Sequence, residues 1–333
     1  MNHPCLTVII PVHNSSSTLR QVIASVKNEL GPDDALIAVD DRSSDGSRAI
    51  LEEMEVTTIE SAGKPGAAGT RNTGAFEAAT EWILFVDSDA VVPGSWRQQL
   101  GKRMEQAEAV QGVYSRRAPG TGAATFYKNY YYFHTFTRRI RGPFIKGCGT
   151  FFFAVKRDIF KALGGFDENI SGATIEDADF SERLWTGGGR IVIAPEIEVF
   201  HLREYTPLQF FRYEWKMMKA KALYILRRDR SRGAPSISVA GFREMIPVLS
   251  GAVSSWVFIA GLALWFSGFH YGPAVSILGL AVTAAGQSSF VYHALKDGGF
   301  RGGLACLYIL PDLILVIPAV LAACVSFISG KKY

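Results

Sequence analysis

Short apolar runs and longer amphipathic segments alternate along the first part of the chain. Four runs have the length and the β-branched or aromatic content of buried strands: 6–10, 35–39, 56–59 and 82–86. Three segments between them have helical composition: 19–29, 43–53 and 67–79. Strands that alternate with helices predict an α/β fold with a doubly wound, mostly parallel sheet.

Polar residues follow three of these predicted strands directly. They are His13-Asn14, Asp40-Asp41 and Asp87-Ser88-Asp89. In doubly wound sheets, ligands bind beyond the carboxyl ends of the strands. The pattern therefore predicts one ligand site at this edge of the sheet.

The chemistry of these residues favours a metal and a phosphorylated ligand. Asp87 and Asp89 repel each other unless a cation lies between them, and Mg²⁺ or Mn²⁺ commonly bridges carboxylates and substrate phosphates. The glycine-rich segment 63–72 runs into a helix and offers backbone N–H groups to an anion. It lacks the Gly-Lys-Ser/Thr ending of a P-loop, and no GxGxxG follows the first strand, which disfavours a dinucleotide oxidoreductase.

Taken in order, six motifs within roughly residues 5–205 resemble the family 2 glycosyltransferases, GT-A fold enzymes that use nucleotide-diphosphate sugars. These motifs are Val8–Asn14, Val39–Gly46, Gly66–Asn72, Phe85–Asp89, Gly164–Glu168 and Ile175–Phe180. The ordered set is far more specific than any one motif.

The resemblance implies a role for each matching residue. The residues expected to bind the nucleotide sugar are Pro11, His13, Asn14, Asp40, Asp41, Arg71, Asp87 and Ser88. Those expected to bind Mg²⁺ or Mn²⁺ are Asp89, with Asp87 assisting, and His201, for which a purely structural role is the alternative. Asp177 matches the general base and Glu176 is the second candidate, although acidic residues also suit any helix N-terminus. The backbone expected beneath the acceptor is Gly147, Cys148 and Gly149.

The last third of the chain is apolar. No Asp, Glu, Lys or Arg occurs from Ile246 to Leu295. Because about 20 helical residues cross a hydrocarbon core of about 30 Å, three transmembrane helices are predicted, at about 246–268, 273–295 and 304–328. Asp312 is then either a functional intramembrane carboxylate or, as we favour, a residue near the interface in a span that starts at Pro311. Three spans would place Lys331 and Lys332 on the side of the membrane away from the cytoplasm, against the positive-inside rule. A third segment that re-enters the membrane without crossing it is therefore an alternative.

Two further segments suggest contact with lipid. Residues 206–245 hold nine basic and three acidic side chains among aromatic ones, which is typical of an amphipathic segment on an anionic leaflet. This charge places the preceding domain in the cytoplasm. In Tyr127–Arg141, aromatic and arginine side chains either rest on the bilayer and admit a lipid-linked acceptor or pack in a core.

Composition agrees with an enzyme of this kind. The chain holds 35 Lys and Arg against 31 Asp and Glu, and a net charge of +4 is too small to predict nucleic-acid binding. We therefore expect a catalytic domain at 1–205, an interfacial segment at 206–245 and membrane helices at 246–330. The predicted protein is a multi-pass enzyme of the inner (cytoplasmic) membrane with its catalytic domain in the cytoplasm. It would move a sugar from a UDP- or GDP-sugar to a lipid-linked or glycan acceptor. A nucleotidyltransferase and an inactive membrane scaffold are the alternatives.

Overall fold

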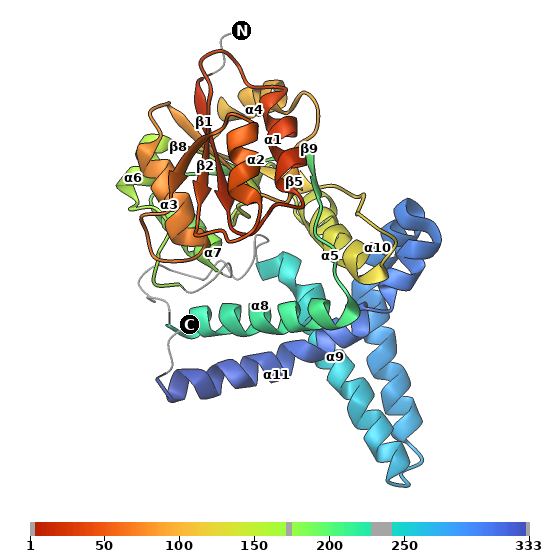
Figure 1. Cartoon of the computed structure of the whole chain (residues 1–333). Helices are drawn as coiled ribbons and strands as arrows, with labels where there is room; N and C mark the ends of the chain where they lie inside the picture. Colours follow the sequence, from red (N-terminus) through yellow and green to blue (C-terminus); the bar gives the residue numbers. More distant parts are fainter. Residues whose placement is uncertain (1–3, 171–174, 228–241, 331–333) are drawn as a thin grey trace.

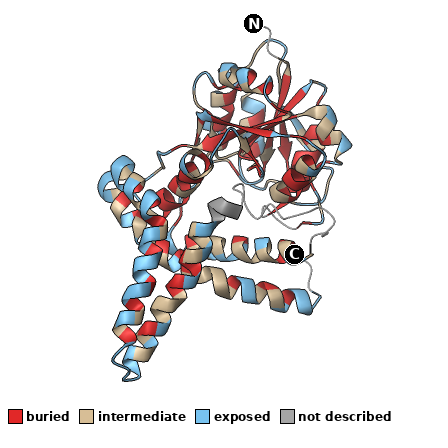
Figure 2. Cartoon of the chain, turned by 180° about the vertical axis from the view of Figure 1, so that it is seen from behind, coloured by how far each residue is buried: buried red, intermediate tan, exposed pale blue. Residues whose placement is uncertain are grey.

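The computed structural model describes residues 4–170, 175–227 and 242–330. An α/β domain forms one part of the molecule, and long C-terminal helices lie beneath it (Figure 1). Burial is concentrated in the sheet and where the helices meet, whereas the far end of the helices is largely exposed (Figure 2).

The described residues contain a nine-stranded sheet with the order β3-β2-β1-β4-β8-β6-β9-β5, and β7 also pairs with β9. The strands are β1 (Leu6–Val12), β2 (Ala35–Asp40), β3 (Thr57–Glu60), β4 (Trp82–Val86), β5 (Ala90–Val91), β6 (Ala109–Tyr114), β7 (Phe144–Ile145), β8 (Phe152–Lys156) and β9 (Ile191–His201). Strands β1 to β4 are parallel, and β6 is parallel to β9. The remaining pairs, which involve β8 or β9, are antiparallel.

The predicted α/β class with a doubly wound, mostly parallel sheet is confirmed. Strands β1 and β4 are buried over almost their whole length, because apolar side chains on both faces of a central strand are covered by helices. The four predicted strands agree with the structure to within about two residues at each end.

Seven α-helices and a π-helical turn accompany the sheet in the described residues. They are α1 (Leu19–Lys27), α2 (Ser47–Glu53), α3 (Ala67–Glu77), α4 (Trp96–Met104), α5 (Ala123–His134), η1 (Thr135–Arg139), α6 (Arg157–Ala162) and α7 (Glu176–Thr186). Helix α3 is rich in small residues because it packs tightly on the sheet. A side chain at Gly74 would come within 2.7 Å of Ile9 and 2.9 Å of Val39.

Four long helices follow: α8 (Pro207–Arg227), α9 (Phe242–Phe266), α10 (Gly272–Cys306) and α11 (Ile309–Ile328). Three segments are long and apolar enough to cross a membrane: Ile246–Phe266, Gly272–Cys306 and Ile309–Ile328. These correspond to the predicted spans, except that the second helix does not end at 295. It continues to Cys306 through a kink at Gly299, whose φ of 53° is in the left-handed region that glycine tolerates.

Helices α9 and α10 form a hairpin that extends away from the α/β domain (Figure 1). Their backbones approach closely at glycines, since a side chain at Gly279 would lie 2.5 Å from the backbone nitrogen of Phe258. Helix α8 lies beneath the α/β domain, α11 packs along its far side, and both run across the direction of the hairpin (Figure 1). The third apolar helix is thus not aligned with the other two.

An aromatic cluster joins the α/β domain to the C-terminal helices. Tyr127, Tyr130 and Phe133 of α5 are buried against Phe210 of α8 and Phe290 of α10. For these three side chains of α5, the prediction that Tyr127–Arg141 rests on the bilayer is wrong, and core packing is the correct alternative. The aromatic rings fill the junction between two parts of the same protein.

Asp312 belongs to the same junction. It lies in the first turn of α11, as expected, but its side chain is buried in protein instead of facing an interface. Its Oδ2 accepts a hydrogen bond of 2.9 Å from the Tyr127 hydroxyl. The carboxylate therefore ties α11 to α5.

Part of the predicted basic segment, and the chain end, lie outside the described residues. The charged residues concerned are Arg228, Asp229, Arg230, Arg232, Lys331 and Lys332.

Candidate active site

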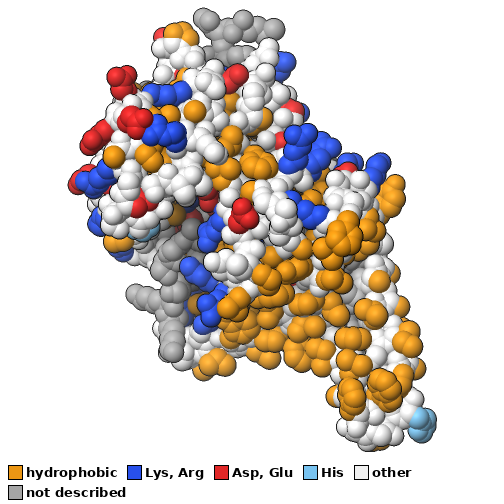
Figure 3. Space-filling view, turned by 45° about the vertical axis from the view of Figure 1, so that its right-hand side comes forward, with side chains coloured by type: hydrophobic (Ala, Val, Ile, Leu, Met, Phe, Trp, Pro, Cys, Tyr) orange, Lys and Arg blue, Asp and Glu red, His pale blue; other side chains and the backbone are white. Residues whose placement is uncertain are grey.

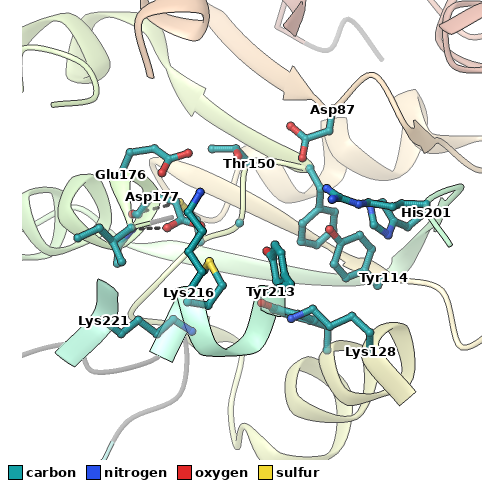
Figure 4. A pocket seen from close by; sticks show the side chains of 18 of the residues that line it. Asp87, Tyr114, Lys128, Thr150, Glu176, Asp177, His201, Tyr213, Lys216 and Lys221 are labelled. Atoms are coloured by element: carbon teal, nitrogen blue, oxygen red, sulfur yellow. Dashed lines mark hydrogen bonds between the residues drawn. The ribbon is translucent and has the colours of Figure 1, made fainter. Parts of the chain in front are cut away.

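A cavity of about 560 Å³ lies between the sheet edge, the N-terminus of α7 and helix α8 (Figure 4). Its lining includes nine of the residues predicted from the sequence: Arg71, Asp87, Asp89, Gly147, Cys148, Gly149, Glu176, Asp177 and His201. Residues that are more than 100 positions apart in the sequence thus meet in one space. This convergence identifies the cavity as the candidate active site.

Arg71 connects two sides of the cavity. Its guanidinium donates to Asp87 Oδ1 at 2.7 Å and to Glu176 Oε1 at 3.1 Å. The Arg71 side chain is only 4% exposed, so these ion pairs are shielded from water. Asp87 is therefore held by Arg71 through Oδ1, and its predicted part in binding the cation together with Asp89 stays a prediction.

Asp89 faces His201 at the end of β9. The antiparallel pair of β5 and β9 sets Ala90 opposite His201, which brings His201 Nε2 to 3.3 Å from Asp89 Oδ2. Burial opposes ionisation of Asp89, but the hydrogen bond and the charge of His201 outweigh it and lower the pKa of Asp89. On its other side, the His201 ring places Nδ1 3.2 Å from Asn129 Oδ1.

The donor set of Asp89 and His201 fits a divalent cation. If His201 bound a cation through Nε2, the remaining ring proton would lie on Nδ1 and donate to Asn129 Oδ1, and the Nε2 lone pair would replace the hydrogen bond to Asp89. A cation between these two electron-pair donors would satisfy both. Among the residues that the structure describes, no three His, Cys, Asp or Glu side chains form a complete metal site. The protein would thus supply part of the coordination, as is usual for Mg²⁺ bound together with substrate phosphates.

Glu176 and Asp177 begin helix α7 and project towards the cavity (Figure 4). Loss of water around the carboxylate and the neighbouring charge of Glu176 raise the pKa of Asp177 to about 7. The Ala178 N–H donates to Asp177 Oδ1 at 2.7 Å. Asp177 can therefore exchange a proton near neutral pH, which a general base requires.

The predicted acceptor segment is tied to the same helix. The Cys148 N–H donates to Ser181 Oγ at 2.9 Å, and Ser181 Oγ donates to the Asp177 carbonyl at 2.6 Å. Gly147 and Gly149 flank this contact and line the cavity. Burial raises the pKa of the Cys148 thiol, which keeps it protonated and unreactive.

The predicted nucleotide-binding residues of β1 and β2 do not line this cavity but form a hydrogen-bonded rim next to it. Within this rim, His13 Nδ1 lies 2.6 Å from the Asp41 carbonyl, and the Asn14 side chain accepts from the Ser44 N–H at 2.8 Å. Asp41 Oδ2 accepts from the Gly66 N–H at 2.8 Å, just before α3, the helix that carries Arg71.

Three more of the predicted residues belong to this rim. Pro11 pairs with Val39 between β1 and β2. Ser88 is hydrogen-bonded to Ser15 at 2.7 Å. Asp40 is 1% exposed and bound by Arg48 at 2.7 Å, so its carboxylate is already used within the protein.

Several residues of the cavity were not predicted from the sequence. They are Tyr114, Lys128, Asn129, Tyr132, Arg203, Gln209, Arg212, Tyr213, Lys216 and Lys221. Lys128 forms an ion pair with Glu214 of α8, and its Nζ lies 4.8 Å from the Tyr132 ring centroid and 4.4 Å from that of Tyr213. The basic residues of α8 were visible in the sequence, but were assigned to the membrane surface.

Comparison with known proteins agrees with this geometry. Residues 7–164 match the family model described as Glycosyl transferase family 2. The O-antigen chain rhamnosyltransferase WbaN of Salmonella anatum is 26% identical over 221 residues, 62% of this chain and 69% of WbaN. Glycosyltransferase GlyG of Streptococcus pneumoniae is 27% identical over 129 residues, 37% of this chain and 43% of GlyG. The match thus spans less than half of GlyG.

A solved structure shares the fold. The mannosyltransferase PcManGT of Pyrobaculum calidifontis, in complex with GDP-Man and Mn²⁺, has a TM-score of 0.60 to this chain, with 17% sequence identity. The likeness covers 100% of this chain and 89% of PcManGT. It shows that the α/β domain has the GT-A fold and that long helices follow it.

Proposed function

The chain is a family 2 glycosyltransferase with a GT-A domain and three long apolar C-terminal helices, and from this premise we propose a specific reaction for it. It is a membrane-anchored, inverting enzyme that moves a sugar from a nucleotide-diphosphate sugar to a lipid-linked or glycan acceptor. The observation that supports this most strongly is that Asp177 shares one cavity with Asp89 and His201.

In this proposal the donor lies along the sheet edge. The nucleoside occupies the rim around His13, Asn14, Asp41 and Ser88, where polar side chains and backbone groups offer hydrogen bonds. The structure of PcManGT contains GDP-Man and Mn²⁺, so a GDP- or UDP-sugar is the donor class to test first.

Asp89 and His201 hold Mg²⁺ or Mn²⁺ in this proposal. When bound, the cation supplies positive charge to the diphosphate that departs from the sugar. Asn129 orients His201 through the contact at Nδ1, which keeps Nε2 directed towards Asp89. Arg71 adds a fixed positive charge beside Asp87 on the same wall.

Asp177 acts as the general base. The acceptor hydroxyl attacks the anomeric carbon of the donor sugar while its proton passes to Asp177. The bond between that carbon and the diphosphate oxygen breaks, and the nucleoside diphosphate leaves with the bonding electrons. The negative charge of Glu176, which is held by Arg71, favours the protonated state of Asp177 that follows the transfer.

The helices supply the membrane anchor. Large apolar side chains are exposed along them, including Trp265, Phe266, Ile277, Leu278 and Ile328. This surface suits lipid and is costly in water. With the excess of basic residues in 206–245, it supports a protein of the inner membrane whose catalytic domain faces the cytoplasm.

The test is a donor panel with the full chain in neutral detergent, Mg²⁺ or Mn²⁺, and membrane lipid extract as the source of acceptor. We expect release of a nucleoside diphosphate that depends on both the metal and the extract. Asp89→Ala should abolish it, whereas Asp158→Asn, at an exposed carboxylate on α6, should leave it unchanged. Release of the sugar 1-phosphate would indicate the nucleotidyltransferase alternative, because transfer of the nucleotidyl group leaves the sugar with the second phosphate. No turnover with any donor would favour the inactive scaffold.

A further inference from the structure

Three cations on the cavity side of α8 form no ion pair with any residue that the structure describes. Arg212, Lys216 and Lys221, here called the α8 cations, all line the cavity. In the described part of the chain, none of them has a carboxylate within 4.0 Å of its side-chain nitrogen atoms. Cations that form no ion pair and line a cavity attract an anionic ligand.

Contacts to the catalytic domain fix helix α8 at two points. Glu214 forms an ion pair with Lys128 of α5. Ten residues later, the Tyr224 hydroxyl donates to Glu182 of α7 at 2.7 Å. Lys216 and Lys221 lie between these contacts, so their position relative to Asp177 at the start of α7 is set by the fold.

Lys216 and Lys221 lie on the Asp177 side of the cavity, away from His201 (Figure 4). Figure 4 shows Lys216 extending from α8 towards Asp177, on the side of the predicted base, whereas His201 lies at the other end of the view. On the sheet side, Arg71 already provides a cation for the donor. The α8 cations therefore adjoin the space that remains for the acceptor.

The same helix borders the lipid-facing surface. α8 packs along α11, which is long and apolar enough to cross a membrane. Figure 3 shows Lys and Arg side chains directly next to the broad hydrophobic surface of the C-terminal helices. A molecule with an anionic head and an apolar tail could place the head at α8 and the tail on this surface.

We propose that the α8 cations bind the phosphate or diphosphate of a lipid-linked acceptor and thereby place its accepting hydroxyl at Asp177. This proposal rests on the proposed function and identifies its acceptor as an anionic lipid phosphate instead of a neutral glycan. Lysine and arginine are the side chains that bind phosphate oxygens. The α8 cations are thus specificity-determining residues.

The chain offers a matched control on the same helix. Lys219 has the same charge and lies between Lys216 and Lys221 in sequence, but it does not line the cavity. Lys216→Gln/Lys221→Gln and Lys219→Gln remove charge without changing side-chain length much. A general attraction of basic helices for anionic amphiphiles would involve all three lysines.

The experiment measures equilibrium binding of radiolabelled farnesyl diphosphate to the full chain in neutral detergent. UDP and GDP are both present at saturation with Mn²⁺, so that the donor site is filled whichever nucleotide it binds. We expect Lys216→Gln/Lys221→Gln to weaken binding of farnesyl diphosphate about tenfold or more, because charged hydrogen bonds are lost. Lys219→Gln should bind as the wild type does, and farnesol should bind far more weakly than the diphosphate.

Four outcomes would overturn the proposal. Equal loss in Lys219→Gln would show general surface electrostatics, and equal binding of farnesol would show that the apolar tail alone is recognised. Reduced affinity for the nucleoside diphosphate would assign the lysines to the donor. Unchanged binding of farnesyl diphosphate in a folded double variant would exclude the site. Because no turnover is needed, failure of the proposed function in the donor panel is seen separately.

Discussion

The two walls of the cavity balance their charges differently. On the sheet side, Arg71 is paired with Asp87 and Glu176, and His201 lies against Asp89. On the helix side, Lys128 is paired with Glu214. The α8 cations have no such partners among the described residues. Folding itself therefore completes most of the sheet wall, whereas the helix wall keeps charge that a ligand has to balance.

Asp177 is the exception on the sheet side. In the described part of the chain its carboxylate forms no ion pair, and its pKa is raised to about 7. A paired carboxylate is stabilised as an anion and is a weak base, while an unpaired one in a place poor in water holds a proton more tightly. Under the proposed function, this difference assigns proton transfer to Asp177 and an organising role to the paired carboxylates Asp87 and Glu176.

The largest effect on the rate of transfer is expected from removing the Asp177 carboxylate. Asp177→Asn should lower transfer by about 10³-fold, within the range for loss of a general base. Binding of the nucleoside diphosphate should persist, because the donor lies on the other side of the cavity. Single-turnover transfer and nucleotide binding measure the two separately. If Glu176→Gln caused this loss and Asp177→Asn did not, Glu176 would be the general base instead of Asp177.

The next largest effect concerns stability and the ion pairs that Arg71 forms on the sheet side of the cavity. Arg71→Met leaves Glu176 and Asp87 without their shared cation, and breaking a buried ion pair in this way costs about 3–5 kcal/mol. Thermal unfolding in detergent should show a large decrease in Tm. Arg20→Met, which breaks an exposed ion pair with Glu53, is the control and should change Tm little. Similar changes in both variants would mean that the sheet wall does not depend on Arg71.

A smaller and graded effect is expected from pH. A base whose pKa is about 7 is protonated below that pH, so single-turnover transfer should fall about tenfold for each pH unit below 7 and level off above it. The stability changes in the opposite sense. Because folding raises the pKa of Asp177, its contribution to stability is present in acid and is lost as the pH rises towards 7. A rate that does not change between pH 5 and 8 would contradict the assignment of Asp177.

The smallest effect is expected on stability, at the contact between α5 and α11. Tyr127→Phe removes the hydrogen bond to the buried Asp312 and should destabilise the protein by about 1–3 kcal/mol. Tyr130→Phe removes the hydroxyl that donates at 2.6 Å to Asp297, whose side chain is exposed, and should cost less because water can replace the lost partner. Thermal unfolding of both variants gives the comparison. A Tyr127→Phe variant as stable as the wild type would show that Asp312 does not hold α11 against α5.

The sheet and the acidic residues at its edge could be predicted because they depend on local pattern. The run Trp82–Val86 is apolar on both faces, which predicts a central strand with helices packed on both sides. Asp87 and Asp89 directly follow this run, so they are expected at the end of the strand. The same logic located Asp40 and Asp41. It could not show that Asp40 is bound by Arg48, since that contact depends on how α2 lies against β2.

Helix α8 marks the limit of this approach. Its alternating aromatic and basic residues are compatible with a bilayer surface and with a cavity wall. In both places the aromatic side chains contact apolar groups and the basic side chains contact anionic ones. The contacts of Glu214 with Lys128 and of Tyr224 with Glu182 show that one side of α8 packs on the α/β domain and forms the cavity wall, and each contact joins residues more than 40 positions apart. The role of the segment 206–245 at the membrane surface stays a prediction. The amino-acid sequence by itself determined the strands, the acidic strand ends and the apolar helices, which follow from neighbouring residues. Only the tertiary structure decided which charges face each other, since that depends on distances between segments that the order of residues does not contain.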